Sequence, residues 1–175
     1  MYKYLLVFLC CVTMPVLAEN KPPQTVPYVD IARYMGKWYE IARIPNSFQK
    51  SCRSEITATY QLLANGQIQG VNTCRKANGQ LFDLVVKGTV QDKSNAKIVF
   101  KITSSWLRWI PMLSADYWVV DLASDYRYAA VSTANHQYVW LLARQPQLSA
   151  ADYQLLLERL AGQGFDVSKI IKNKQ

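Results

Sequence analysis

Short runs of alternating hydrophobic and polar residues recur along the chain between residues 37 and 144. Successive side chains of a strand point to opposite faces of a sheet, so a period of two indicates half-buried strands. The pattern predicts eight strands, at residues 37–44, 55–63, 67–74, 81–90, 97–102, 117–122, 128–133 and 138–144. The turns between the first five strands are short and contain no helix, which is typical of antiparallel neighbours.

Two Asn-Gly dipeptides mark hairpin turns within this series, at Asn65-Gly66 and at Asn78-Gly79. Such dipeptides favour tight two-residue hairpins. Eight antiparallel strands joined in a meander can close on themselves, which leaves no exposed edge strand. The sequence therefore predicts an all-β fold, an eight-stranded antiparallel up-and-down β-barrel.

Two segments have helical rather than strand character. Residues 30–35 read as a single helical turn with Asp30 as its N-cap, ended by Gly36. A longer helix is predicted from Ser149 to about Ala161, with Asp152 completing the cap. Its apolar residues form one stripe, so we expect it to pack on the outside of the barrel; they are Tyr153, Leu156, Leu157 and Leu160. Residues 165–171 can add a further short strand.

The first eighteen residues have the pattern of a secretory signal peptide. Lys3 supplies the positive charge, residues 5–12 the apolar segment, and residues 16–18 a small-residue cleavage site. Cys10 suggests an alternative, a lipid-attached cysteine of the bacterial lipoprotein type, but Leu9 stands where such a site requires a small residue. We expect an exported protein, periplasmic or secreted after cleavage near Ala18, rather than an outer-membrane lipoprotein.

The remaining chain divides into an arm and one domain. Residues 19–29 contain three prolines and are expected to be extended. Residues 30–175 have the length of a single domain with a substantial core. The sequence therefore predicts a signal peptide at 1–18, an N-terminal arm at 19–29 and one domain at 30–175.

The chain is basic, with a formal net charge of +8 and a sequence pI of about 9.4. Such a charge suits nucleic acid, an anionic membrane surface, an anionic ligand or simple solubility. No nucleic-acid-binding motif is present in the sequence, and an exported protein rarely meets such a partner. We therefore expect no nucleic-acid partner and keep an anionic membrane surface as a possible one.

Few residues are available for catalysis. His136 is the single histidine and falls in a predicted turn, and the sequence has no serine-histidine-aspartate grouping or phosphate-binding loop. Outside the leader there are two cysteines, Cys52 and Cys74, which in an oxidising compartment more often form a disulfide than a metal site or a nucleophile. We predict no enzyme activity, no metal and no cofactor; free thiols would revive an enzyme with a cavity thiol.

Three short motifs occur in order at the predicted strand positions. They are Gly36-x-Trp38 at the start of the first strand, Ser124-Asp125-Tyr126 between the sixth and seventh, and Arg144 at the end of the eighth. Together they resemble the three signatures of the lipocalins. The segments 36–43, 124–130, 140–146 and 164–169 are most similar to the bacterial branch of that family, and the resemblance covers residues 28–172. The departure is the leader, which lacks the clear lipid-attachment motif of many bacterial lipocalins.

The resemblance implies a barrel that holds apolar ligands. In lipocalins the arginine lies across the tryptophan ring at the closed end, a cation–π contact. Gly36, Trp38, Asp125 and Arg144 are thus expected to build the closed end rather than to bind the ligand. In the first strand, alternation places Trp38, Glu40 and Ala42 on one face.

The open end should then be formed by the loops at residues 46–53, 75–79, 104–115 and 134–136. Cys52 and Cys74 fall near this mouth, so we predict a disulfide at the rim. Basic residues are expected around it, beside an apolar segment at 106–113; they are Lys50, Arg53, Arg75, Lys76 and Arg108. They form either a solvated basic surface or a cationic, aromatic collar suited to a negative lipid head.

Residues expected to line the cavity or its rim follow from alternation and from the apolar loop: Tyr60, Ile98, Phe100, Ile102, Trp106, Arg108, Trp109, Tyr117, Trp118, Tyr138 and Trp140. Tyr117 and Trp118 compete for the inward side of one strand. An eight-stranded barrel can also be filled by its own side chains. The sequence predicts non-enzymatic binding and transport of a small hydrophobic ligand, a fatty acid or a lysophospholipid. The alternatives are a lipocalin-fold enzyme and a module that docks on a membrane or protein through 106–113.

Overall fold

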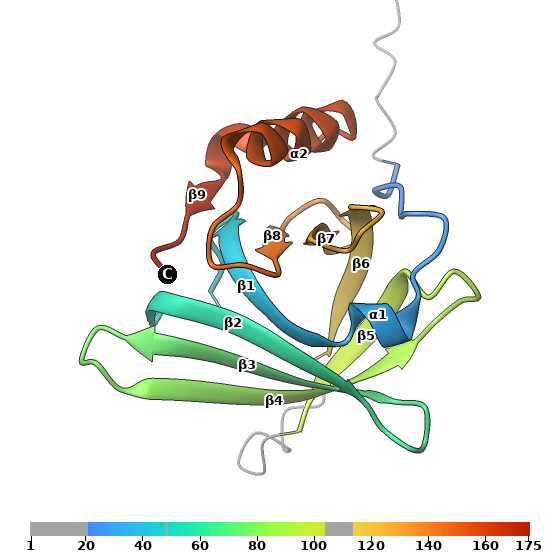
Figure 1. Cartoon of the computed structure of the whole chain (residues 1–175), viewed down its shortest axis with the longest axis horizontal. Coiled ribbons are helices and arrows are strands. Elements are labelled where there is room, and N and C mark those ends of the chain that lie inside the picture. The colour runs from blue at the N-terminus through green and yellow to red at the C-terminus, as the bar shows by residue number, and fades with distance from the viewer. Residues whose placement is uncertain (1–20, 48, 104–113) are drawn as a thin grey trace, which may run out of the picture.

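The protein is a closed ring of antiparallel strands with one long helix outside it (Figure 1). The structure, a computed structural model, describes residues 21–47, 49–103 and 114–175. Trp106, Arg108, Trp109, the apolar segment 106–113 and the leader lie outside the described residues.

Eight strands make the ring: β1 (Gly36–Arg43), β2 (Cys52–Leu62), β3 (Ile68–Lys76), β4 (Leu81–Val90), β5 (Lys97–Ile102), β6 (Ser114–Leu122), β7 (Tyr128–Ser132) and β8 (Val139–Ala143). Each strand pairs antiparallel with the next, and β1 pairs with both β2 and β8. The predicted eight-stranded antiparallel barrel is confirmed.

The turn chemistry behaves as the sequence indicates. Gly66 and Gly79 have φ values of +78° and +81°, in the left-handed region that the second residue of a tight Asn-Gly turn requires. These turns fix the register of the β2–β3 and β3–β4 pairs. β4 and β5 have the predicted bounds, whereas β2 and β6 each start three residues earlier than predicted.

Helix α1 (Ile31–Tyr34) lies at the start of β1 (Figure 1). The Asp30 carboxylate accepts a hydrogen bond from the backbone N–H of Arg33, the N-cap that the sequence predicts. The Tyr126 hydroxyl accepts another from the Asp30 N–H at 2.8 Å, and the Arg33 guanidinium lies 4.1 Å from the centre of the Tyr126 ring. The turn before β7 therefore holds α1 in place.

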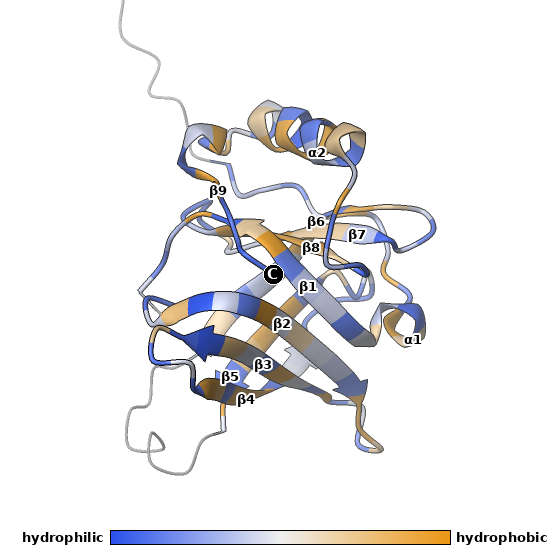
Figure 2. Ribbon diagram, turned by 60° about the vertical axis from the view of Figure 1, so that its left-hand side comes forward, coloured by the Kyte–Doolittle hydropathy of each residue, from blue (hydrophilic) through white to orange (hydrophobic). Residues whose placement is uncertain are grey.

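Helix α2 (Ala150–Gly162) packs against the outside of the barrel. Ser149 caps it, accepting from the Asp152 N–H at 3.0 Å. Hydrophobic and hydrophilic residues alternate along the helix (Figure 2), and its buried face contacts a cluster on β1, β6, β7 and β8. The predicted amphipathic helix and its packing are confirmed.

A β-bulge interrupts the alternation of β1. The pairing of β1 with β8 shifts register between Glu40 and Ala42. Trp38 belongs to the core inside the barrel, whereas Ala42 packs in the cluster beneath α2. The expectation that Ala42 shares the face of Trp38 is therefore wrong, because the extra residue of a bulge reverses the faces beyond it.

The last residues fill a seam in the barrel wall. β1 pairs with β2 only from Gly36 to Tyr39, and beyond that point residues 171–175, here called the C-terminal strap, lie between the two strands. The strap follows the 3-10 helix η2 (Val167–Lys169) and includes β9 (Ile171–Lys172), which pairs with β1. The Lys174 carbonyl accepts from the Glu55 N–H at 3.0 Å, so the strap joins both strands.

Candidate ligand-binding cavity

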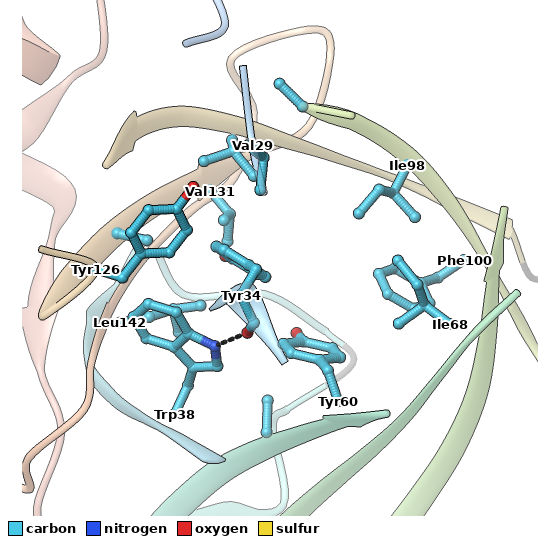
Figure 3. Packing of buried hydrophobic residues seen from close by; sticks show 14 of the residues in the cluster. Val29, Tyr34, Trp38, Tyr60, Ile68, Ile98, Phe100, Tyr126, Val131 and Leu142 are labelled. Atoms are coloured by element: carbon cyan, nitrogen blue, oxygen red, sulfur yellow. Dashed lines mark hydrogen bonds between the residues drawn. The ribbon is translucent and has the colours of Figure 1, made fainter. Parts of the chain in front are cut away.

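The closed end of the barrel is built on Trp38, which is completely buried. The Arg144 guanidinium lies 3.7 Å from the centre of its ring. Arg144 also donates to the backbone carbonyls of Arg33 and Tyr34, at 2.7 and 3.1 Å, and to that of Lys37 at 3.0 Å. The Trp38 indole N–H donates to the Tyr34 carbonyl at 2.9 Å (Figure 3). The polar atoms at this end are thus satisfied by backbone of α1 and β1.

Gly36 and Asp125 support the closed end from its edge. Gly36 has a φ of +93°, and a Cβ there would lie 3.4 Å from the Arg144 guanidinium. The Asp125 carboxylate accepts from the backbone and the guanidinium of Arg127, at 3.1 and 3.0 Å. Arg127 also pairs with Asp152 of α2 at 2.6 Å. Asp125 therefore stabilises the turn before β7 and, through Arg127, the contact of this turn with α2. None of these residues lines the cavity.

A layer of aromatic side chains separates the closed end from the space above it. The Tyr34 and Tyr117 hydroxyls are 2.8 Å apart, and the Tyr60 and Phe100 rings each meet the Tyr117 ring edge to face. Figure 3 shows Tyr34 between Trp38 and Tyr60. Burial raises the pKa of Tyr34, Tyr60 and Tyr117, so these hydroxyls stay neutral.

Above this aromatic floor lies a cavity of about 470 Å³. Its walls are mostly apolar and include Ile56, Ala58, Leu84, Val86, Ile102, Val131 and Leu142. At the other end it reaches uncharged polar residues of the β7–β8 turn, Thr133, Asn135 and Gln137. A volume of this size is within the range of small-molecule sites, about 300–1,000 Å³. The barrel is therefore hollow rather than filled by its own side chains.

Six of the residues expected from alternation line this cavity: Tyr60, Phe100, Ile102, Tyr117, Tyr138 and Trp140. Ile98 also faces the barrel interior, but it is packed in the core beside the cavity (Figure 3). The prediction that Trp118 lines the cavity is wrong. Its side chain packs on the α2 side of the wall, and the Lys97 ammonium lies 4.5 Å from the centre of its ring. Alternation allowed either neighbour to point inward, and Tyr117 takes that side with its hydroxyl bonded to Tyr34.

Cys52 and Cys74 form the expected disulfide, with their Cα atoms 5.5 Å apart. Both cysteines line the cavity, and they pack with Ile56 and Phe82. The bond ties β2 to β3 at the upper wall. It also leaves neither residue as a free thiol, which removes these two as nucleophiles for an enzyme.

The basic residues expected at the mouth do not line the cavity. Lys50, Arg53, Arg75 and Lys76 are absent from its described lining. Arg75 instead donates to both carboxylate oxygens of exposed Glu55, at 2.7 and 2.8 Å, and the Lys76 ammonium lies 4.5 Å from the Phe82 ring. The alternating pattern of a strand does not predict such partners for the residues at its end. Within the part of the chain that the structure describes, the cavity has no cationic lining.

Glu40, which was not among the predicted site residues, lines the cavity with a side chain that is only 8% exposed. Its carboxylate accepts from Arg43 at 2.9 Å and from Asn173 of the C-terminal strap at 2.9 Å. Gln49 donates to it at 2.6 Å, and the Trp140 indole N–H donates to Gln49 at 2.8 Å. Burial raises the pKa of Glu40. The sequence contains a signal for this residue, because alternation places Glu40 on the same face of the strand as Trp38.

No three histidine, cysteine, aspartate or glutamate side chains within residues 21–47, 49–103 and 114–175 are grouped to hold a metal ion. In the same ranges, no helix has both the length and the apolar character needed to cross a bilayer.

A closed antiparallel barrel with a sealed base and a hollow, apolar interior defines a class of proteins that hold small molecules inside the barrel. The chain belongs to the lipocalin family, since the family model for the Lipocalin-like domain matches residues 29–175.

Relatives and solved structures agree with this assignment. The chain is 31% identical over 165 residues to temperature-induced lipocalin-1 of Arabidopsis thaliana, covering 91% of this chain and 86% of the relative. It is also 31% identical over 155 residues to the outer membrane lipoprotein Blc of Escherichia coli K12, covering 86% and 83%. The crystal structure of lobster apocrustacyanin A1 has a TM-score of 0.66 at 15% identity, covering 91% and 93%, and shows the shared fold.

Proposed function

We propose that this protein binds and carries a single-chain lipid, a fatty acid or a lysophospholipid, without catalysing a reaction on it. The observation that carries the proposal is the apolar cavity of about 470 Å³ above a floor of neutral tyrosines. Lipocalins bind small hydrophobic ligands, and transfer of an acyl chain from water to apolar walls gains about 0.8 kcal/mol for each buried CH₂. An acyl chain with many CH₂ groups therefore binds in the cavity with a favourable free energy.

The distribution of polar groups supports a ligand with one apolar and one polar end. The floor is aromatic, and Thr133, Asn135 and Gln137 supply uncharged hydrogen-bonding groups at the turn end of the cavity. A lipid that packs its tail against the apolar walls can turn its polar group to the polar part of the lining, to which Glu40 and Gln49 also belong. Because ligand sites commonly combine apolar walls with a few polar groups, this arrangement fits an amphiphile better than a pure hydrocarbon.

We also propose that the protein is exported, in line with the signal peptide predicted at residues 1–18. The Cys52–Cys74 disulfide supports an oxidising compartment. The mass of the protein recovered after expression with its full leader tests this: cleavage near Ala18 gives an unmodified chain, whereas lipid attached to a cysteine gives a larger mass. An uncleaved leader would contradict the proposal.

The experiment for the binding function is native mass spectrometry of the purified protein, followed by titration with palmitate and with lysophosphatidylcholine. We expect co-purified lipid or uptake of one molecule per chain. Leu84→Trp fills the cavity and should abolish uptake, whereas Lys87→Trp, on an exposed position of the same strand, should not. A chain that carries no lipid and takes up neither ligand would overturn the proposal.

A further inference from the structure

The charged residues that line the described cavity are both acidic, Glu40 and Asp116. They differ in burial, since Asp116 is exposed whereas Glu40 is buried. Glu40 is two residues beyond Trp38 on the inward face, which places it ~7 Å above the closed end. A carboxylate in an apolar wall is expensive to bury unless its oxygens are hydrogen-bonded. Its partners therefore show which of its oxygens are already satisfied.

The donors around Glu40 are unevenly distributed over its two oxygens. Oε1 accepts from Arg43 and Asn173, both at 2.9 Å, whereas Oε2 accepts from Gln49 alone among the described donors. An ionised carboxylate offers about four acceptor positions. One acceptor position on Oε2 thus remains for a further donor.

Gln49 is itself fixed in the orientation that leaves this position open. Its Oε1 accepts from the Trp140 indole at 2.8 Å and from the Asn46 amide at 2.7 Å, so its NH₂ group must point to Glu40. The positive charge that balances Glu40 belongs to Arg43, which does not line the cavity. The cavity therefore meets the carboxylate and the amide, not the guanidinium.

We propose that Glu40, positioned by Gln49, selects the polar group of the ligand by accepting a hydrogen bond from a hydroxyl or ammonium group and by disfavouring an ionised carboxylate. This inference rests on the proposed lipid-binding function. An alcohol or amine supplies the donor that Oε2 lacks, whereas an ionised fatty-acid carboxylate has no hydrogen to donate and meets no described cation in the lining. Of the two proposed ligand classes, it favours the lysophospholipid, which has a free glycerol hydroxyl.

The test compares three ligands with the same twelve-carbon chain: dodecanol, dodecylamine and laurate. Each displaces the neutral fluorescent probe N-phenyl-1-naphthylamine from the delipidated full chain at pH 7, below its micelle concentration. We expect the alcohol and the amine to bind at least about tenfold more tightly than laurate, as a hydrogen bond to a buried charged group allows. Equal affinities of the unmodified protein for all three ligands would overturn the proposal without any variant.

Variants then assign the preference to one carboxylate. Glu40→Gln keeps the size of the side chain and should bring the three affinities within about threefold of one another. Glu158→Gln, the same change at an exposed position of α2 outside the cavity, is the matched control and should leave the preference unchanged. A Glu40→Gln protein that weakens all three ligands equally has lost only structure, which contradicts selection by Glu40. If neither the probe nor any ligand binds, the lipid-binding function itself fails, and the inference fails with it.

Discussion

Two regions of the barrel, its closed end and the cavity wall, each hold a charged side chain near a tryptophan, but they satisfy its hydrogen bonds differently. Arg144 is half-buried, whereas Glu40 is buried. At the closed end, Arg144 covers Trp38 and donates to backbone carbonyls. In the cavity wall, Glu40 is held by the side chains of Arg43, Gln49 and Asn173. Backbone partners lock the first group into the fold, whereas side-chain partners leave the second facing the cavity. The comparison separates residues that build the barrel from residues that meet its contents.

Replacement of the two tryptophans tests this separation most strongly. Trp38→Ala removes a completely buried ring and should lower the free energy of unfolding by about 3–5 kcal/mol. Trp140→Ala, in the cavity wall, should cost less stability, because its ring is only half-buried, and should weaken lipid binding. Urea unfolding and probe displacement measure the two effects. Equal stability losses would contradict the division of roles.

The disulfide is the main covalent support of the cavity end. The Cys52→Ser/Cys74→Ser double variant should lose about 3 kcal/mol of stability, because the unfolded chain is no longer constrained by a loop between residues 22 positions apart. Urea unfolding gives this value, and unmodified protein treated with a reductant serves as the control. A variant as stable as the oxidised protein would show that the disulfide does not contribute to the stability of the cavity wall.

Arg144→Lys sharpens the comparison at the closed end. Lysine keeps the charge but cannot reproduce the planar fork that reaches several carbonyls at once, so the free energy of unfolding should fall by about 2 kcal/mol. Arg127→Lys is the matched control, since its partners Asp125 and Asp152 form ion pairs near the surface that contribute about 0–1 kcal/mol. Similar losses in both variants would argue against a special role for the closed end.

The smallest expected effect is a pH dependence at Glu40. Burial raises its pKa above the ordinary value of 4.5, so the folded protein holds the proton more tightly than the unfolded chain. The stability contributed by this group is therefore fully present below pH 4.5 and is lost as pH rises through the folded-state pKa. Urea unfolding at several pH values should show the unmodified protein losing stability relative to Glu40→Gln over this window. A difference independent of pH would contradict the assignment.

The sequence predicted the fold well because its signals are local. The Asn-Gly turns fixed the hairpins, and Ser149 with Asp152 marked the start of α2. Alternation failed beyond Glu40, where a bulge depends on pairing with β8 rather than on the residues of β1 alone. The same local rule could not choose between Tyr117 and Trp118, since the choice depends on a hydroxyl partner contributed by α1.

The candidate site was less predictable because it depends on contacts between distant segments. Tyr60, Phe100 and Trp140 line the cavity as strand periodicity indicated. Strand periodicity did not reveal that Arg75 pairs with Glu55 on a neighbouring strand. The surroundings of Glu40 include Asn173, which has no periodic pattern to reveal that it returns to β1.

The C-terminal strap has a consequence for how the chain folds. The hairpins from β2 to β4 join neighbouring segments, whereas the Asn173 side chain reaches the Glu40 carbonyl across 133 residues of sequence. Contacts of such separation form slowly, so the seam between β1 and β2 is expected to close late. Until then both strands present unpaired edges, which readily recruit strands from other chains. We therefore expect the closed strap to protect these edges from aggregation and from strand exchange between copies.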